Sequence, residues 1–570
     1  MGNFLKTQNS FDCGEMSSEF YAINNNNGVS KLENMDIMAS GGLKRRFGLK
    51  KIKNTSNGAI IVPFSISESE KYLLVIYNFS VDIYSNDVKI TTINAPWARA
   101  DLSKLQYAQR FNKLFFVHPD YQPRILTKTA SGFKFSFFYF KTNVNGSVNI
   151  PFMKFDDASG ISITITTNVL GNNYATFTTN ADFWTQDAIG ERLFVDNKQW
   201  IVSAVQDARV ATVYINGNYS VPGSPIYDWY ESVFNEKRGW PSCVSFHQNR
   251  LIFGATKSVP NCVWMSKVGD YTNFDVGTGL DDEAIYVTLL SAQHHQICTM
   301  VSSDNLQILT TQGEWAIANS PLTPSNVDIK QHTNIGCFYA SYLPPQTIES
   351  RTVFISQSGK DIRELDLDTL GEHYNAVDLC PFAKHLINNP ISMAYNQNTH
   401  QLFIVMNNGY MAVLNKHQNQ NISGWATYKT DGDFKYVAVL DDSTYVVVKR
   451  NGTNYLEKFD SDCLNDAGEY DFNYTICAFP MLVNNHAPKK LRARKISLRV
   501  LDTKTLFVNG QRVQIPNSVY ADGCAGYSGD LSIDLLGTQN DTMQPLWTIS
   551  SDEQLPATIL SVTVDGIYSI

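Results

Sequence analysis

The sequence predicts an all-β protein: a β-propeller of six or seven blades, interrupted by a small inserted β domain and followed by a C-terminal β domain. Two observations carry this prediction. The 570 residues are 43% hydrophobic and 12% aromatic but only 18% charged, which is typical of strand-rich globular proteins and excludes a disordered chain. One short strand phrase also recurs at the spacing of propeller blades. A string of β-sandwich domains is the alternative, since it would also contain many short strands.

Residues 1–54 lack the repeated phrase and are rich in turn residues, so we expect an N-terminal arm or docking segment there. No apolar stretch has the length of a signal peptide or of a membrane-spanning helix, and Lys6 does not fit a myristoylation signal. The nine cysteines are an odd number, and no two form a Cys-x-x-Cys pair. We therefore expect reduced thiols and synthesis in a reducing cytoplasm.

The repeated phrase is a polar residue, one spacer and a β-rich apolar run. Its copies begin at Lys71, Asn112, Asn249, Asn305, Arg351, His400 and Ser443. All but one of the intervals between copies lie near the ~40–50 residues of a propeller blade. A turn and a second strand-like run follow most copies, as expected for consecutive β-hairpins. The sequence therefore predicts a propeller in two parts, residues 55–140 and 238–460.

The remaining interval between copies, 137 residues, is too long for one blade. Residues 141–237 hold several strand-like runs, among them the strictly alternating Ile161–Thr166, and we expect a small inserted β domain there. The phrase stops after residue 460. Strand-like runs at 495–500 and 558–564 predict a C-terminal β domain over residues 461–570.

Because propellers often host glycosidases, paired carboxylates are the first chemistry to look for. The sialidase Asp-box is absent, and the densest acidic cluster is Asp281, Asp282 and Glu283. This cluster has the groups for holding a cation or for acid/base chemistry. Neighbouring carboxylates on a strand point to opposite faces, however. A solvated loop or a hydrogen-bonded turn is the favoured interpretation.

Two further patterns suggest metal binding only superficially. Asp366 and Asp368 begin a stretch that ends at Gly371 and lacks the third ligand and closing Glu of a calcium loop. His294 and His295 are adjacent, so they diverge in a strand, and no third ligand stands at zinc spacing. We therefore expect no catalytic residue, no cofactor and no metal.

Two basic clusters remain. The first is Lys44–Arg46 followed by Lys50, Lys51 and Lys53, and the second is residues 489–495. A solvated face or a charged sheet edge is the default interpretation of each, and contact with another subunit or with phosphates is the alternative. The net charge of −8 argues against a protein that holds nucleic acid by neutralising phosphates.

Several motifs occur in an order that matches a known family. The central ones are Gly-Trp-Pro at 239–241 with Phe246-His-Gln-Asn-Arg-Leu-Ile-Phe, Trp264-Met-Ser-Lys-Val-Gly-Asp-Tyr-Thr-Asn-Phe, Asp281-Asp-Glu-Ala-Ile, Leu309-Thr-Thr-Gln-Gly-Glu-Trp and Leu322-Thr-Pro. The N-terminal ones are Phe11-Asp-Cys-Gly-Glu-Met-Ser, Leu32-Glu-Asn and Gly41-Gly-Leu-Lys-Arg-Arg-Phe-Gly. Together they resemble the tail nozzle or hub proteins of short-tailed bacteriophages, of the tail tubular protein B type. Phe47 stands where the family has Pro, and the usual Pro after Ser17 is missing.

The resemblance implies a structural virion protein with no enzymatic activity. Such a propeller-bearing subunit forms a sixfold ring below the tail adaptor ring, lets double-stranded DNA pass, and supports fibres, spikes or tip proteins. It is assembled in the host bacterial cytoplasm without stable membrane insertion. An acidic chain suits a conduit because phosphate-binding side chains would retain DNA. A propeller enzyme or lectin acting on host surface polysaccharide is the alternative.

Overall fold

A computed structural model describes residues 2–20, 27–167, 173–217, 219, 221–291, 293–368, 371, 373–417, 420–483, 487–520, 525–537 and 543–569. The chain divides into two compact units, residues 1–102 with 343–570 and residues 103–342. The structure is nearly all β, and the helical segments in the described ranges are 3₁₀ turns of three to six residues. None of the described helices is long and apolar enough to span a bilayer.

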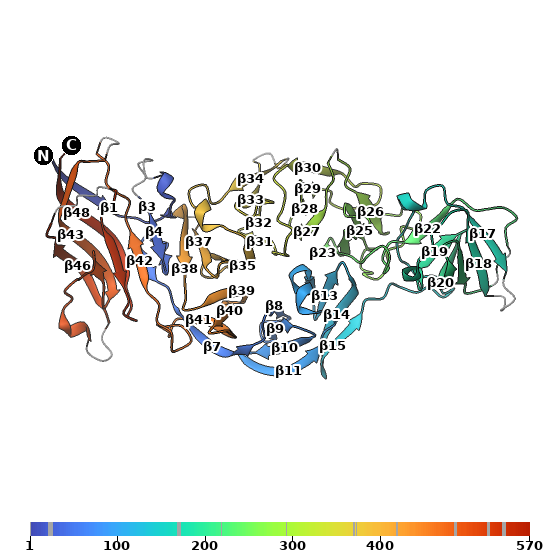
Figure 1. Cartoon of the computed structure of the whole chain (residues 1–570), viewed down its shortest axis with the longest axis horizontal. Helices are drawn as coiled ribbons and strands as arrows, with labels where there is room; N and C mark the ends of the chain where they lie inside the picture. Colours follow the sequence, from blue (N-terminus) through green and yellow to red (C-terminus); the bar gives the residue numbers. More distant parts are fainter. Residues whose placement is uncertain are drawn as a thin grey trace. The chain divides into compact units, whose positions relative to one another are not determined.

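Four-stranded antiparallel meanders are the repeated element, and the described residues form seven of them (Figure 1). The first unit holds four of them. One is made of β8 (Ile60–Ser65), β9 (Lys71–Tyr77), β10 (Ser80–Ser85) and β11 (Val88–Asn94), and the next of β31 (Gln346–Ile348), β32 (Arg351–Ile355), β33 (Ile362–Leu367) and β34 (Tyr374–Asp378). The third is made of β35 (Pro390–Asn396), β36 (Gln401–Met406), β37 (Met411–His417) and β38 (Ile422–Tyr428), and the fourth of β39 (Asp433–Leu440), β40 (Ser443–Arg450), β41 (Thr453–Asp460) and β7 (Gly48–Thr55). The second unit holds β12 (Gln106–Arg110), β13 (Lys113–His118), β14 (Tyr121–Thr129), β15 (Gly132–Phe137); β23 (Cys243–His247), β24 (Arg250–Gly254), β25 (Cys262–Met265), β26 (Ile285–Thr288); and β27 (Ile297–Ser302), β28 (Leu306–Thr310), β29 (Gly313–Ile317), β30 (Ile329–Thr333).

Each copy of the sequence phrase forms the second strand of one of these sheets. A second strand has a neighbour on each edge, and its two faces are covered, so it needs apolar residues in a continuous run. Strands β24 and β36 illustrate this, because every residue in them is buried. The prediction of an all-β propeller is confirmed.

The blade made from β39, β40 and β41 takes its fourth strand from the start of the chain. Strand β7 pairs antiparallel with β41, with Gly48 opposite Asp460 and Lys50 opposite Lys458. Two segments far apart in the sequence are thereby joined in one sheet, as Figure 1 shows for the blue and orange strands.

Between β15 and β23 lies a separate seven-stranded sheet with its own hydrophobic core. Its strands, in spatial order, are β16 (Phe152–Met153), β22 (Trp229–Ser232), β19 (Arg192–Val195), β20 (Lys198–Asp207), β21 (Val210–Tyr214), β18 (Tyr174–Thr179) and β17 (Ile163–Thr167). This sheet occupies the stretch for which we predicted an inserted β domain.

We predicted an arm for residues 1–54, but the structure builds this segment into sheets with the C-terminal region. Strand β1 (Gly2–Gln8) pairs with β48 (Thr558–Ser569), and β4 (Lys31–Glu33) pairs with both β38 and β42 (Tyr474–Cys477). In Figure 1 these blue strands lie beside red and orange ones. The reason is burial: Phe11, Val29, Leu32 and Met35 belong to the same core as C-terminal residues.

The C-terminal region contributes a second large sheet. Its main path is β46 (Tyr527–Asp534), β43 (Lys490–Thr503), β48, β6 (Leu43–Arg45) and β5 (Met35–Ile37). The remaining strands of this unit are β2 (Gly14–Glu15), β3 (Gly28–Val29), β47 (Thr548–Ser551), β44 (Phe507–Val508) and β45 (Gln511–Arg512), which extend the sheet of β35–β38.

Candidate functional site

The acidic cluster at residues 281–283 is a hydrogen-bonded turn. Glu283 Oε2 accepts the backbone N–H groups of three successive residues at 2.7–2.8 Å, and these bonds, that from Leu280 first, hold its pKa below the usual range. Asp282 pairs with Lys267 at 2.7 Å, and this hydrogen bond also lowers its pKa. A general acid needs a raised pKa. These carboxylates have the opposite tendency, which fits the turn that the sequence favoured.

The adjacent histidines point in different directions. His294 is exposed, whereas His295 is buried, hydrogen bonds to Ser291 and to Thr310 Oγ1 (3.1 Å), and lies edge-on to Trp315. Burial, and secondarily the charge of His294, lowers the pKa of His295. His295 is therefore a neutral packing residue.

The calcium-like stretch is also occupied by internal contacts. Asp366 pairs with Arg351 at 3.0 Å, and the backbone N–H of Asp368 donates to the carbonyl of His373. Thr369 and Leu370 of this stretch lie outside the described residues.

The default interpretation of the first basic cluster, a solvated face, is wrong for two of its members. Arg45 and Arg46 are 3% and 1% exposed. Arg46 forms a bidentate pair with buried Asp466 at 2.8 and 3.0 Å and donates its Nε to Asn34. A carboxylate 420 positions away in the sequence is what allows this charge to be buried. Lys50, in contrast, is exposed and pairs loosely with Asp460 at 3.9 Å.

The second basic cluster follows the alternation that the sequence indicated. Its charged side chains at 490, 492, 494 and 495 are exposed, while Leu491 and Ile496 are buried. They stand on β43, which has β46 on one edge and β48 on the other. The pairing with β46 begins only at Lys495, so Lys490 and Arg492 lie on a solvated stretch of β43 that is paired with β48 alone.

Four of the central motifs that carry the family resemblance meet at one buried side chain. Arg250 is 0% exposed and donates hydrogen bonds to four backbone carbonyls. The acceptors are Ser266 (2.8 Å), Glu283 (2.5 Å), Asp281 (2.9 Å) and Leu322 (3.3 Å). Four motifs separated in the sequence are thus joined through one guanidinium group. The residues of these motifs therefore have a structural role, because they hold strands and turns together. A substrate-binding role is not needed to explain why the motifs occur.

A second buried charge cluster lies in the second unit. Arg238 donates to Glu231 (Nε, 3.0 Å) and to both carboxylate oxygens of Asp157, and Lys237 pairs with Glu231 at 3.1 Å. Glu191 is 2% exposed and accepts a hydrogen bond from Asn235 Nδ2 at 3.0 Å. Burial, and then the charge of Glu231, raises the pKa of Glu191 well above its ordinary value. With Glu191 protonated, two cations balance two carboxylates.

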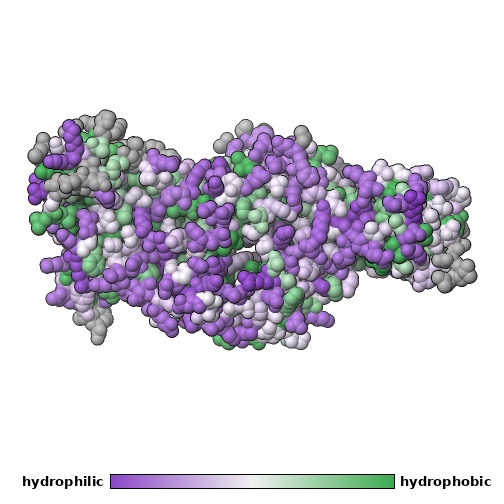
Figure 2. Space-filling model, in the orientation of Figure 1, coloured by the Kyte–Doolittle hydropathy of each residue, from purple (hydrophilic) through white to green (hydrophobic). Residues whose placement is uncertain are grey.

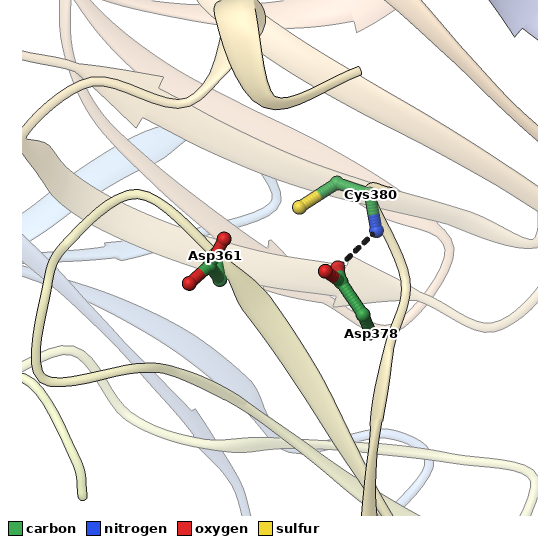
Figure 3. Close-up of side chains that lie close together, drawn as sticks. All are labelled: Asp361, Asp378 and Cys380. Atoms are coloured by element: carbon green, nitrogen blue, oxygen red, sulfur yellow. Dashed lines mark hydrogen bonds between the residues drawn. The ribbon is translucent and has the colours of Figure 1, made fainter. Parts of the chain in front are cut away.

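One trio of potential metal ligands comes together in the described residues: Asp361, Asp378 and Cys380 (Figure 3). Their ligand atoms lie within 4.8 Å of one another. The trio joins the β33–β34 hairpin to the turn after it, where the Cys380 N–H donates to Asp378 at 2.9 Å.

The contacts of this trio do not suit a cation. Lys384 pairs with Asp361 at 2.9 Å and with Asp378 at 3.2 Å. Arg363 lies 3.7 Å from each carboxylate. Burial raises the pKa of the Cys380 thiol to about 12, and a metal-binding cysteine has to be a thiolate. The charges are already neutralised, so the trio is a structural ion-pair network.

A cavity of about 190 Å³ opens in the first unit, where the N-terminal strands meet the β35–β38 blade. Its polar lining is Glu15, Lys31, Glu33, His385, Asn408, Tyr410, Thr427 and Lys429, and its apolar lining is Leu386, Met406, Met411 and Ala412. Parallel pairing of β2 and β4 with β38 brings these segments together, with Gly14 opposite Trp425 and Glu33 opposite Thr427.

The charges of this cavity are arranged in two groups. In the first, Glu33 Oε2 is shared by Lys429 (2.8 Å) and Lys31 (3.1 Å). Burial opposes ionisation of Glu33, but the hydrogen bonds with the two lysines outweigh it and lower its pKa. In the second, Glu15 accepts from the Leu32 N–H (2.9 Å) and contacts His385 Nε2 (3.1 Å).

Sequence reasoning missed this cavity because its side chains come from separate short segments. Glu15 stands in a two-residue strand and His385 in the 3₁₀ turn Lys384–Leu386. No spacing pattern connects them. The available signals were Glu15, within the Phe11-Asp-Cys-Gly-Glu-Met-Ser motif, and Glu33, within the Leu32-Glu-Asn motif.

The visible face of the molecule is predominantly hydrophilic, with hydrophobic residues scattered over it (Figure 2). Single exposed apolar residues are normal on soluble proteins. This face therefore gives no sign of a large apolar docking surface.

Comparisons with known proteins give little further information. No protein-family model matches the sequence, and no curated protein matches it. Among solved structures, BamB from Moraxella catarrhalis is 10% identical with a TM-score of 0.34, covering 72% of this chain and 100% of its own. BBS1N in complex with ARL6DN is 10% identical with a TM-score of 0.26, covering 73% and 98%. Both neighbours are β-propeller proteins, and similarity at this level carries no argument about function.

Proposed function

We propose that this chain is a structural virion protein, the nozzle or hub subunit of a short bacteriophage tail. Six copies form a ring below the tail adaptor ring, conduct the genome during ejection, and hold fibres, spikes or tip proteins. The observation that carries the proposal is the ordered set of family-like motifs together with their convergence on Arg250. The motifs support a scaffold, because their polar side chains hold strands and turns.

The second support is the internal use of the acidic residues that an enzyme would need. Asp282 and Glu283 are held ionised by Lys267 and by backbone N–H groups. A glycosidase needs one carboxyl group that stays protonated near neutral pH. The cluster lacks that feature.

Negative-stain microscopy of the purified protein, alone and with its adaptor, tests the proposal. We expect sixfold rings with a central hole, because a ring needs heterologous interfaces that close. Compact monomers in both samples would contradict the proposed ring.

The rival function, an enzyme acting on host surface polysaccharide, has its own test. The double variant Asp281→Ala, Asp282→Ala should leave ring assembly intact if the protein is folded. Neither the parent nor the variant should cleave capsular polysaccharide or lipopolysaccharide. Cleavage by the parent that the variant loses would establish the enzyme instead.

The proposal extends to the charge of the channel. The chain has a formal net charge of −8, so a ring of copies is strongly acidic. We expect Asp and Glu to predominate on the channel wall, since phosphate-binding Lys and Arg would slow DNA. A ring structure with a continuous basic lining would contradict this.

A further inference from the structure

The cavity between the N-terminal strands and the β35–β38 blade has the composition of a ligand site. Ligand pockets combine apolar walls with a few convergent polar groups. Here Met406, Met411 and Leu386 supply apolar wall, and eight polar or charged residues converge on the same space. At about 190 Å³ the cavity is many times larger than the ~10–15 Å³ that a single water needs.

The first requirement of a ligand follows from the lysines. The lining as a whole holds two lysines and two carboxylates, and Lys31 and Lys429 share one of these carboxylates, Glu33. Each ammonium has three donors, of which Glu33 engages one. A carboxylate of the ligand placed against the two lysines uses their remaining donors in charge-assisted hydrogen bonds.

The second requirement follows from the acceptors. Glu15 and Glu33 line the same space, and a simple anion would meet their like charge. Hydroxyl groups donate to carboxylates and accept from amide and imidazole groups, so they suit Glu15, Asn408 and His385. The ring of Tyr410, which is 44% exposed and lies 4.5 Å from Lys429 Nζ, offers an apolar surface for a ligand's C–H groups.

We propose that this cavity binds a small hydroxylated carboxylate of the uronic acid class. The carboxylate lies against Lys31 and Lys429, the hydroxyl groups face Glu15 and Asn408, and the ring rests beside Tyr410. The site belongs to one chain and does not depend on the proposed ring.

Titration of the full-length protein with D-glucuronate by calorimetry tests the proposal. We expect millimolar binding that is at least tenfold tighter than that of D-glucose, acetate or inorganic phosphate. Glucose lacks the carboxylate, and acetate and phosphate lack the carbon-bound hydroxyl groups. The proposal would be overturned if D-glucose, acetate or phosphate bound as tightly as glucuronate. It would also be overturned if millimolar glucuronate, at about 50-fold the protein concentration, showed no binding.

Variants locate the binding in the cavity. Lys429→Gln and Tyr410→Ala should each weaken glucuronate binding about tenfold, and Lys429→Arg should retain most of it. Lys435→Gln is the matched control, because Lys435 pairs with Asp433 on β39 and does not line the cavity. Thermal unfolding shows whether each variant is folded. Tyr410 is partly exposed, so we expect Tyr410→Ala to fold. This variant can therefore still test the site if Lys429→Gln does not fold. Unchanged affinity in folded Tyr410→Ala and Lys429→Gln would refute the site.

Discussion

At the scale of single residues, buried charged groups determine which segments are joined. Arg250 and Arg46 are both almost completely buried, and each joins segments that carry different motifs. Sequence reasoning placed Arg46 on a solvated face, because its partner Asp466 is remote in the chain. For His294 and His295 it predicted only that the two side chains diverge, and the structure leaves His294 exposed and buries His295.

Removing the Arg250 guanidinium should destabilise the second unit. In Arg250→Met, four backbone carbonyls lose their donor in a buried place, so we expect the free energy of unfolding to fall by about 3 kcal/mol or more. Chemical denaturation followed by tryptophan fluorescence measures this. Arg209→Met is the control: Arg209 is a solvent-exposed partner of Asp182, and its loss should change little. Equal effects of both variants would show that Arg250 has no special role.

The raised pKa of Glu191 predicts a pH dependence of stability. The folded chain keeps a proton that the unfolded chain releases near the ordinary value of 4.5. Stability should therefore fall as the pH rises from about 4.5 through the folded-state pKa, and level off above it.

The variant Glu191→Gln isolates this contribution. Glutamine is neutral at every pH and keeps an acceptor for Asn235, so the variant should lose that slope and be more stable than the parent at pH 8. Melting temperatures of both proteins from pH 4.5 to 9 provide the measurement. If the melting temperatures of the parent and the variant changed with pH in parallel, Glu191 would be ionised in the folded chain.

At the scale of elements, the second strands of the blades could be predicted and the N-terminal strands could not. A strand buried on both faces leaves a continuous apolar run, as at Gln401–Met406. Strands of two or three residues, such as β2 and β4, are too short for any periodicity. Their pairing with β38 and β42 depends on residues that are remote in the sequence, such as Thr427 opposite Glu33 and Cys477 opposite Lys31.

Gly14 marks a close backbone approach in this N-terminal docking. Its φ is +62°, and a Cβ would lie 2.3 Å from the Trp425 carbonyl oxygen and 2.5 Å from its nitrogen. Gly14→Ala should therefore cost about 2 kcal/mol and speed proteolysis of the N-terminal strands. Gly223→Ala, at a position with open space and no positive φ, should behave as the parent does. Identical rates of proteolysis for the parent, Gly14→Ala and Gly223→Ala would contradict the tight docking.

The seven-stranded sheet should fold without the propeller. Its core includes Trp184, Trp200 and Trp229, all at most 3% exposed, and a sheet of this size with an apolar face is large enough for independent stability. A fragment of residues 145–238 should unfold cooperatively and show blue-shifted tryptophan emission. Emission at the wavelength of free tryptophan would mean that the sheet needs the propeller.

At the scale of the whole molecule, packing and ion pairs hold the described strands together, and no disulfide joins the described cysteines. Eight cysteines are described, and all are free. The 190 Å³ cavity also belongs to this scale, because five separate segments line it and only the folded chain brings them together.

The melting temperature should therefore be the same with and without dithiothreitol. Disulfides stabilise proteins by roughly 2–4 kcal/mol, so their reduction would be readily visible. Thermal unfolding under both conditions, with a thiol titration of the denatured protein, provides the measurement. A lower melting temperature in dithiothreitol would reveal a bond between cysteines.

The closure of the last blade by β7 has a consequence for synthesis on the ribosome. Ser56 and its contact Asn454 are 398 positions apart, so at ~5–20 residues per second β7 waits roughly 20–80 seconds for its partner to be translated. An unpaired strand is prone to associate with other nascent chains. Lys50, Lys51 and Lys53 lie on β7 itself, and like-charge repulsion between copies protects it during this delay.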